Sequence, residues 1–240
     1  MKTIILQISG FLIGLSKTGL PGAGTLAVPL TAMVIPARTS TGVILPMLIF
    51  GDILAVSWYR KTADWTALVR LLPWAAAGVV IGYFLMGTMN DEILRRVIGA
   101  VVLAMLGLSI FHQKKKEFLA HVPHHPLFAA VMGLLCGITT MLANAAGPIM
   151  ILYLLAMGLK KEEFIGTGAW YFFLVNWFKV PFSAHLGFIN AETLRLNMMT
   201  LPAIFVGGVA GIIFVKKIPE KSFTVIIQIL TLVTAVKLLF

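Results

Sequence analysis

Charged side chains and cysteine are both scarce in this sequence of 240 residues. Charged residues make up 12% of the chain, whereas about 25% is usual in soluble domains, so they cannot cover the surface of a soluble fold of this size. The one cysteine, Cys136, lies inside an apolar stretch, which leaves neither a disulfide framework nor a cysteine-based metal site. These shortages exclude a soluble enzyme, a disordered tail and a disulfide-stapled secreted domain.

Long apolar runs take the place of the missing charge, because 59% of the residues are hydrophobic. A transmembrane helix needs about 20 predominantly apolar residues, and six runs come close to that length, at 41–58, 68–87, 93–111, 166–186, 197–215 and 223–240. The basic residues that give the net charge of +10 stand between these runs, which is typical of loops that set topology and contact anionic lipid. We therefore expect an all-α polytopic membrane protein with lipid, and no nucleic acid, as a partner.

Two shorter apolar pieces precede each trio of long runs, at 3–15 and 20–35 in the first half and at 127–142 and 147–158 in the second. Small residues interrupt these pieces, and each is marginal as a full span. Interruptions of this kind favour broken or re-entrant helices. Each half is therefore expected to hold a broken or re-entrant helix pair and three spanning helices.

Glycines recur at constant distances in the two halves, as an old duplication would leave them. The distance grows from 123 to 129 residues along the chain, and it grows only where loops intervene. We expect a first transmembrane repeat at 1–111, a cytoplasmic connector at 112–126 and a second repeat at 127–240. The matched positions are Gly10 and Gly133, Gly14 and Gly137, Gly24 and Gly147, Gly42 and Gly166, Asp52 and Asn176, Pro73 and Pro202, Gly78 and Gly207, and Gly82 and Gly211.

The basic residues distinguish two orientations of the second repeat. An odd number of crossings per half inverts that repeat and places eleven Lys and Arg on one side against five on the other, whereas an even number spreads the main loops seven to five. Cytoplasmic loops carry the excess of Lys and Arg, so an inverted repeat is favoured. The cytoplasmic set is Arg60, Lys61, Arg70, Lys114, Lys115, Lys116, Lys160, Lys161, Lys216, Lys217 and Lys221, and the opposite set is Lys2, Arg38, Arg95, Arg96 and Arg195.

The connector holds four of the five histidines, His112, His121, His124 and His125, beside a run of lysines. These histidines leave a metal site open, but no carboxylate or thiol accompanies them at a usual ligand spacing. A solvated cytoplasmic loop is the favoured interpretation, and we expect no metal and no cofactor.

The stretch 14–25 is the first that could bind a ligand, and it contains Lys17, Thr18, Gly22 and Gly24. Four glycines and a proline in this stretch cannot form an ordinary spanning helix. A helix that starts after them presents unpaired N–H groups and the positive end of its dipole, which together form an anion site. Close packing by small residues is the alternative, but packing does not require a lysine among the glycines.

The corresponding stretch of the second half, 137–148, again breaks an apolar run with small residues and then starts a helix at Gly147. Asn144 supplies a neutral donor and acceptor there. Two such breaks from inverted halves, meeting near the bilayer centre, are typical of a secondary transporter whose half-helix N-termini face an anionic substrate.

Polar residues inside the spans form a second group, Asp52 with its counterpart Asn176, and Lys179 at i+3 from that asparagine. An ionisable group inside a span indicates function by default. Lys179 could attract an anion and Asp52 could carry a coupling proton. A buried structural ion pair or a snorkelling lysine is the alternative. No nucleophile-elbow, zinc-protease or nucleotide-binding motif is found, so no enzyme activity is expected.

At these residues the sequence resembles the TauE/SafE, or sulfite-exporter-like, permease family. The resemblance is carried by 14–24, 36–58, 141–150 and 163–182, in order, and covers nearly the whole chain. It implies a multi-pass permease of the bacterial inner membrane that moves sulfite, sulfonates or other small organosulfur and carboxylate anions. Asn144, Ala145 and Ala146 before Gly147 depart from the common glycine-heavy second motif, which puts the shape of that half of the site in doubt.

The main hypothesis is a secondary transporter of a small sulfur-containing anion that works by alternating access. A channel-like anion pore and a carboxylate transporter remain alternatives, and a membrane-embedded enzyme or assembly factor is less favoured. A coupling proton or ion and a homodimer are left open. The substrate-binding residues expected are Lys17, Thr18, Gly22, Gly24, Asn144, Gly147, Asn176 and Lys179, with Asp52 as the candidate for proton coupling.

Overall fold

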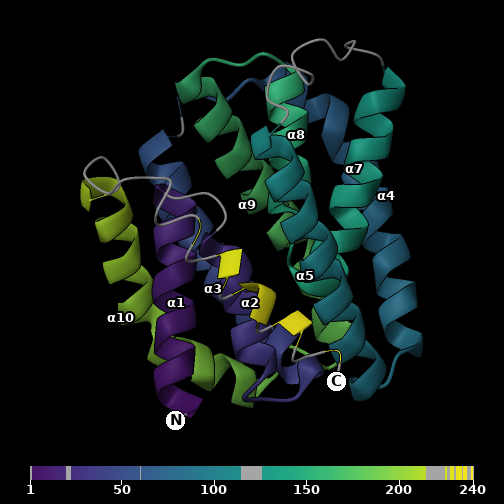
Figure 1. Ribbon diagram of the computed structural model, residues 1–240, viewed down its shortest axis with the longest axis vertical. Coiled ribbons are helices and arrows are strands. Elements are labelled where there is room, and N and C mark those ends of the chain that lie inside the picture. Colours follow the sequence, from purple (N-terminus) through teal and green to yellow (C-terminus); the bar gives the residue numbers. More distant parts are fainter. Residues whose placement is uncertain are drawn as a thin grey trace.

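The computed structural model describes residues 2–19, 23–59, 61–114 and 126–214, together with short pieces between 225 and 239. All regular structure in these parts of the chain is α-helical (Figure 1). The helices are α1 (Lys2–Thr18), α2 (Ala23–Ala32), α3 (Ala37–Tyr59), α4 (Trp65–Thr88), α5 (Asp91–Lys114), α7 (Pro126–Ala143), α8 (Gly147–Ala156), α9 (Lys161–His185) and α10 (Ala191–Phe214).

The long apolar runs of the sequence coincide with helices. The runs at 41–58, 68–87 and 93–111 lie in α3, α4 and α5, and those at 166–186 and 197–215 overlap α9 and α10. The run at 223–240 falls largely outside the described residues. Among the described helices, α3, α4, α7 and α10 are long and apolar enough to cross a membrane. This architecture agrees with the predicted all-α polytopic membrane protein.

The shorter apolar pieces form two helix pairs, α1 with α2 and α7 with α8. The helices α2 and α8 have 10 residues each, which corresponds to about 15 Å, or about half of the hydrocarbon core. The helix α7 differs from the expectation of a marginal piece, because its 18 residues are enough to cross a membrane. It continues through Gly133 and Gly137 since both glycines pack closely against α4.

Polar residues at the helix ends fix where the long helices begin. The Asp64 carboxylate accepts two backbone N–H groups in the first turn of α4, at 2.8 and 3.1 Å. The Asn90 amide oxygen accepts one at the start of α5, at 2.8 Å. Before α10, Asn190 and Thr193 each accept the other's backbone N–H through a side-chain oxygen, at 3.0 and 2.9 Å. These caps satisfy N–H groups that the helices themselves leave unpaired.

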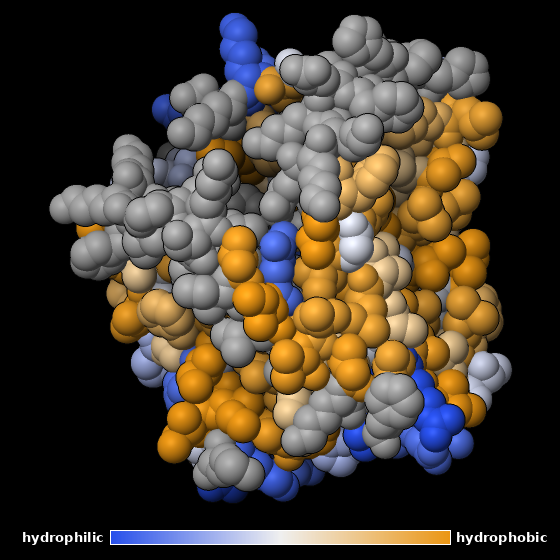
Figure 2. Space-filling view, viewed as in Figure 1, coloured by the Kyte–Doolittle hydropathy of each residue, from blue (hydrophilic) through white to orange (hydrophobic). Residues whose placement is uncertain are grey.

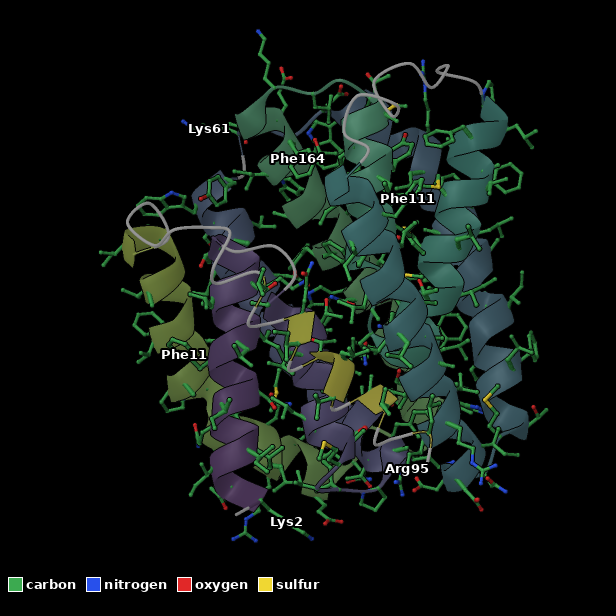
Figure 3. The ribbon with its side chains drawn as sticks, viewed as in Figure 1. Lys2, Phe11, Lys61, Arg95, Phe111 and Phe164 are labelled. Atoms are coloured by element: carbon green, nitrogen blue, oxygen red, sulfur yellow. The ribbon has the colours of Figure 1, made fainter. Side chains whose placement is uncertain are left out.

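The outer surface between the two ends of the bundle is apolar. Large hydrophobic side chains such as Phe84 on α4 and Val206 on α10 are exposed, at 67% and 57%. Figure 2 shows this apolar surface between hydrophilic patches at the two ends. Figure 3 places Lys2 and Arg95 at one end and Lys61 at the other. An apolar belt with charged residues beyond it fits a surface in contact with lipid.

Backbones touch where α1 crosses α10. A Cβ atom at Gly14 would overlap the carbonyl oxygen of Ile204, and one at Gly207 would overlap the carbonyl oxygen of Phe11. Only glycine allows two helices to approach this closely. The helices therefore pack through their backbones at this crossing.

The crossing of α4 and α7 is built in the same way. A Cβ atom at Gly137 would overlap the carbonyl oxygen of Ala75, and one at Gly78 would overlap that of Leu134. The glycines of the two crossings are matched in the sequence, Gly14 with Gly137 and Gly78 with Gly207. Each crossing joins one helix from the first half of the chain to one from the second.

Candidate functional site

A cavity of about 150 Å³ lies between α1, α2, α3, α7, α8 and α9. The first turn of α2 contributes Gly24 and Thr25 to its wall, and α8 contributes its first residue, Gly147. Figure 1 shows α2 in the lower half of the bundle and α8 in the upper half. The cavity therefore meets the N-terminal ends of both short helices, where N–H groups lack helical partners and the helix dipole is positive.

The lining of the cavity combines polar and apolar side chains. The polar groups are few, and the apolar side chains come mainly from α8 and α9. This is the usual lining of a site for a small ligand that a few polar groups orient. The polar lining residues include Ser16, Lys17, Thr140, Asn144 and Asn176, and the apolar ones include Met150, Leu154, Phe164 and Phe172.

Lys17 and Asp52 form an ion pair beside the cavity. The Lys17 Nζ lies 2.6 Å from Asp52 Oδ1, and the Asn176 side-chain amide donates to the other carboxylate oxygen at 2.7 Å. Lys17 also lies over the ring of Phe172, with its Nζ 4.2 Å from the ring centroid. The side chain of Asp52 is 0% exposed and that of Lys17 is 12% exposed. Of this pair, only the lysine lines the cavity.

Lys179 is buried behind the cavity wall, with 1% of its surface exposed. Its ammonium group donates to the Thr140 carbonyl oxygen at 2.8 Å, the Thr140 hydroxyl at 3.1 Å and the Asn144 side-chain oxygen at 2.6 Å. The Asn176 side-chain oxygen lies farther away, at 3.4 Å. An ammonium group has three N–H donors, so protein acceptors use all of them. Lys179 thus holds the end of α7 to the middle of α9.

Asn144 ends α7 in a conformation that is uncommon for a residue with a side chain. Its φ is 51°, in the left-handed region, which asparagine tolerates better than most residues and which often ends a helix. Its side-chain oxygen accepts from Lys179, whereas its side-chain nitrogen is buried without a hydrogen-bond partner among the described residues. Because Asn144 lines the cavity, this amide has a donor to offer to a ligand.

The cluster beside the cavity contains two basic side chains and one acidic side chain. Asp52 is the one acidic residue among the buried residues that the structure describes, and two lysines, Lys17 and Lys179, lie within this cluster. With all three groups ionised, the cluster has one excess positive charge. A buried excess charge is costly unless a counter-ion accompanies it, so the site is suited to an anion.

The structure brings together most of the residues expected from the sequence. Lys17, Gly24, Asn144, Gly147 and Asn176 line the cavity, and Asp52 and Lys179 lie directly behind it.

Thr18 points away from this cluster. Its hydroxyl donates to the Gly208 carbonyl oxygen of α10 at 2.7 Å. Gly22 lies outside the described residues, so its place in the site stays a prediction.

Two residues of the cluster, Thr140 and Phe172, do not figure among the residues expected from the sequence. Thr140 holds the Lys179 ammonium group and Phe172 covers that of Lys17. The match between the two halves could have pointed to Thr140, because it stands 123 positions after Lys17. Helical spacing carries a signal for the second, because Phe172 lies one turn before Asn176 on the same face of α9.

No metal centre is evident in the described part of the chain, where no three His, Cys, Asp or Glu side chains cluster. The connector histidines His121, His124 and His125 lie outside that part, as do Lys115 and Lys116.

The comparisons with known proteins give one match. The family model described as Sulfite exporter TauE/SafE matches residues 6–238. No curated protein and no solved structure matches the chain. The match takes in both halves of the chain and every residue of the cavity wall.

Proposed function

The chain belongs to the TauE/SafE sulfite exporter family of membrane transporters, and from this premise we propose that it moves small anions of the sulfite and sulfonate type. It does so as a secondary transporter of the bacterial inner membrane. The observation that carries the proposal is the cavity that meets two helix N-termini beside a cluster with one excess positive charge. An anion in this cavity can contact the Lys17 ammonium group and the N–H donors of the two helix starts.

Lys17 and the Asn144 amide are the groups that contact the anion directly in this proposal. Both line the cavity, and both have an N–H group directed to no other acceptor among the described residues. The backbone N–H groups near Gly24 and Gly147 add donors from the two helix starts. Asn176 and Lys179 hold Asp52 and Asn144 in place, and Lys179 adds positive potential.

Alternating access is supported by the way the two halves of the chain interlock. The first helix of each half, α1 or α7, crosses the fourth helix of the other half, α10 or α4. The loop contacts are exchanged likewise, because Gly42 of α3 touches Phe188 and its counterpart Gly166 of α9 touches Thr62. An inverted repeat predicts such an exchange of partners, and inverted repeats are the usual basis of alternating access.

Thermal stability of the purified protein against a panel of anions tests the proposal. The panel holds sulfite, thiosulfate, sulfoacetate, taurine, sulfate, acetate and chloride. A ligand present at about 100 times its Kd stabilises the folded state by about 2.7 kcal/mol, which raises the melting temperature measurably. We expect a shift with a sulfur anion, and its loss in a variant that carries both Lys17→Gln and Asp52→Asn.

The double substitution removes the cavity cation together with its partner, so it leaves neither charge of that ion pair without the other. A shift with acetate but with no sulfur anion would assign the site to carboxylates. Cooperative melting without any shift would contradict an anion site. Saturable uptake into proteoliposomes then separates a transporter from an anion pore, which does not saturate in the same range.

A further inference from the structure

Lys17 has two roles that compete for one ammonium group. Its ammonium group is the counter-ion of Asp52, at 2.6 Å, and it is the cavity's own cation. Lys179 cannot take over either role, because its three donors are held by Thr140 and Asn144. An anion that enters the cavity therefore meets a lysine that already has a partner.

Two negative groups on one buried ammonium group repel each other. An anion in contact with the Lys17 Nζ lies close to the Asp52 carboxylate, since both then lie within contact distance of the same nitrogen atom. Two negative charges this close favour protonation of whichever group can accept a proton. Sulfonates stay fully ionised at neutral pH, so Asp52 is the group that takes up the proton.

The surroundings of Asp52 allow it to become neutral. The charged groups that face it from the described helices packed around it are Lys17 of α1 and Lys179 of α9. Asn176 donates to Asp52 Oδ2, and the carbonyl oxygen of a protonated carboxyl still accepts that hydrogen bond. Protonation of Asp52 at Oδ1 therefore costs only its ion pair with Lys17, and the anion replaces Asp52 in that pair.

We propose that the anion replaces Asp52 as the partner of Lys17 and that Asp52 takes up one proton from the aqueous phase as this happens. One proton then binds with each anion, and the two leave together when the ion pair between Lys17 and Asp52 forms again. This inference rests on the proposed function and gives it a coupling ion and a stoichiometry. For a monovalent anion, the loaded and the empty site carry the same charge.

Isothermal titration calorimetry on the purified full-length protein tests the linkage. The probes are methanesulfonate and thiosulfate, whose own charges do not change near neutral pH. Each is titrated at one pH in HEPES and in Tris, because the difference in binding heat between buffers of unlike ionisation enthalpy gives the number of protons taken up. We expect about one proton per bound anion for the wild-type protein.

Two variants locate the proton. Asp52→Asn is expected to bind the anion at least as tightly as the wild-type protein and to take up none. Glu192→Gln removes an exposed carboxylate at the start of α10 and is expected to leave the proton count unchanged.

The possible failures differ in meaning. Binding of either probe without proton uptake by the wild-type protein overturns the linkage and leaves the proposed function standing, and this result needs no variant. Equal uptake by Asp52→Asn and wild type overturns the assignment to Asp52. Absence of binding by both probes contradicts the proposed function itself.

Discussion

Lys17 and Asp52 differ in their access to water, and this difference decides how each tolerates the loss of the other. Lys17→Gln leaves a carboxylate that is 0% exposed without its paired cation, and breaking a buried ion pair in this way costs about 3–5 kcal/mol. Asp52→Asn leaves a lysine that is 12% exposed and lines a cavity. We therefore expect Lys17→Gln to lower the melting temperature in detergent more than Asp52→Asn does.

The variant with both substitutions is the control, because it removes both charges. It should melt above Lys17→Gln alone. Equal destabilisation by the two single substitutions would contradict the unequal hydration that the structure shows.

Asn144 combines an unusual backbone conformation with a hydrogen bond to Lys179. Asn144→Ala strains the backbone at a φ of 51° and takes one acceptor from a buried ammonium group, which together cost about 2–4 kcal/mol. Asn144→Gly loses the same acceptor but accepts the left-handed conformation without strain. Chemical unfolding in detergent should find the glycine variant about 1 kcal/mol more stable than the alanine variant.

Neither Asn144 variant keeps the side-chain amide of this cavity-lining residue, so both should bind anions more weakly than the wild-type protein. An alanine variant as stable as the glycine variant would argue against the left-handed end of α7.

Single polar residues of the site could be recognised from the sequence because each interrupts an apolar run. The sequence marks Asp52, Asn176 and Lys179 in this way, and the structure brings them together. Their partners could not be predicted, since a pairing such as Lys17 with Asp52 depends on how α1 packs against α3. The same holds for Thr18, whose hydroxyl is held by a residue 190 positions away.

At the scale of helices, the two backbone crossings leave no room for a side chain at their glycines. Gly14→Ala places a methyl group against the Ile204 carbonyl oxygen, which has to push α1 and α10 apart. Overpacking of this kind costs about 1–3 kcal/mol. Thermal melting should show Gly14→Ala destabilised, and Gly137→Ala should lose a similar amount at the crossing of α4 and α7.

The matched control is Gly107→Ala in α5, where a Cβ atom meets nothing within 4 Å. Alanine favours a helix over glycine by about 0.5–1 kcal/mol, so this variant should keep or gain stability. A Gly14→Ala variant that melts at the same temperature as the wild-type protein would refute the close crossing.

The positions of the helices along the chain could largely be predicted from the sequence, whereas the helices against which each one packs could not. Apolar runs of about 20 residues mark spans because a membrane imposes that length, and α3, α4 and α10 follow them. The sequence predicts too short a helix for α7, because the glycines of this helix resemble helix breaks. Only the packed structure shows that Gly133 and Gly137 lie against α4 and allow the helix to continue.

At the scale of the whole molecule, the ends of the bundle are expected to face opposite compartments. Lys61 and Arg95 lie at opposite ends (Figure 3), and the excess of Lys and Arg in the loops assigns the end with Lys61 to the cytoplasm. A membrane-impermeant thiol reagent applied to intact cells should label Arg95→Cys, and should label Lys61→Cys only after permeabilisation. Cys136 is buried, so it gives little background.

Labelling of both positions from outside would place the two ends on one side of the membrane and contradict the span assignment. The reverse pattern would keep the spans and invert their orientation.

The two lysines of the site occupy unmatched positions of the repeat. Lys17 corresponds to Thr140 in the second half, and Lys179 corresponds to Ala55 in the first. When the two halves of an inverted repeat exchange conformations, the backbone of one end state is reproduced in the other. The two lysines do not exchange places in this way, because neither has a lysine at the matched position. We therefore expect the inward-open and outward-open states of the proposed transporter to differ in electrostatic energy, so that the unloaded carrier favours one side of the membrane and runs faster in one direction than in the other.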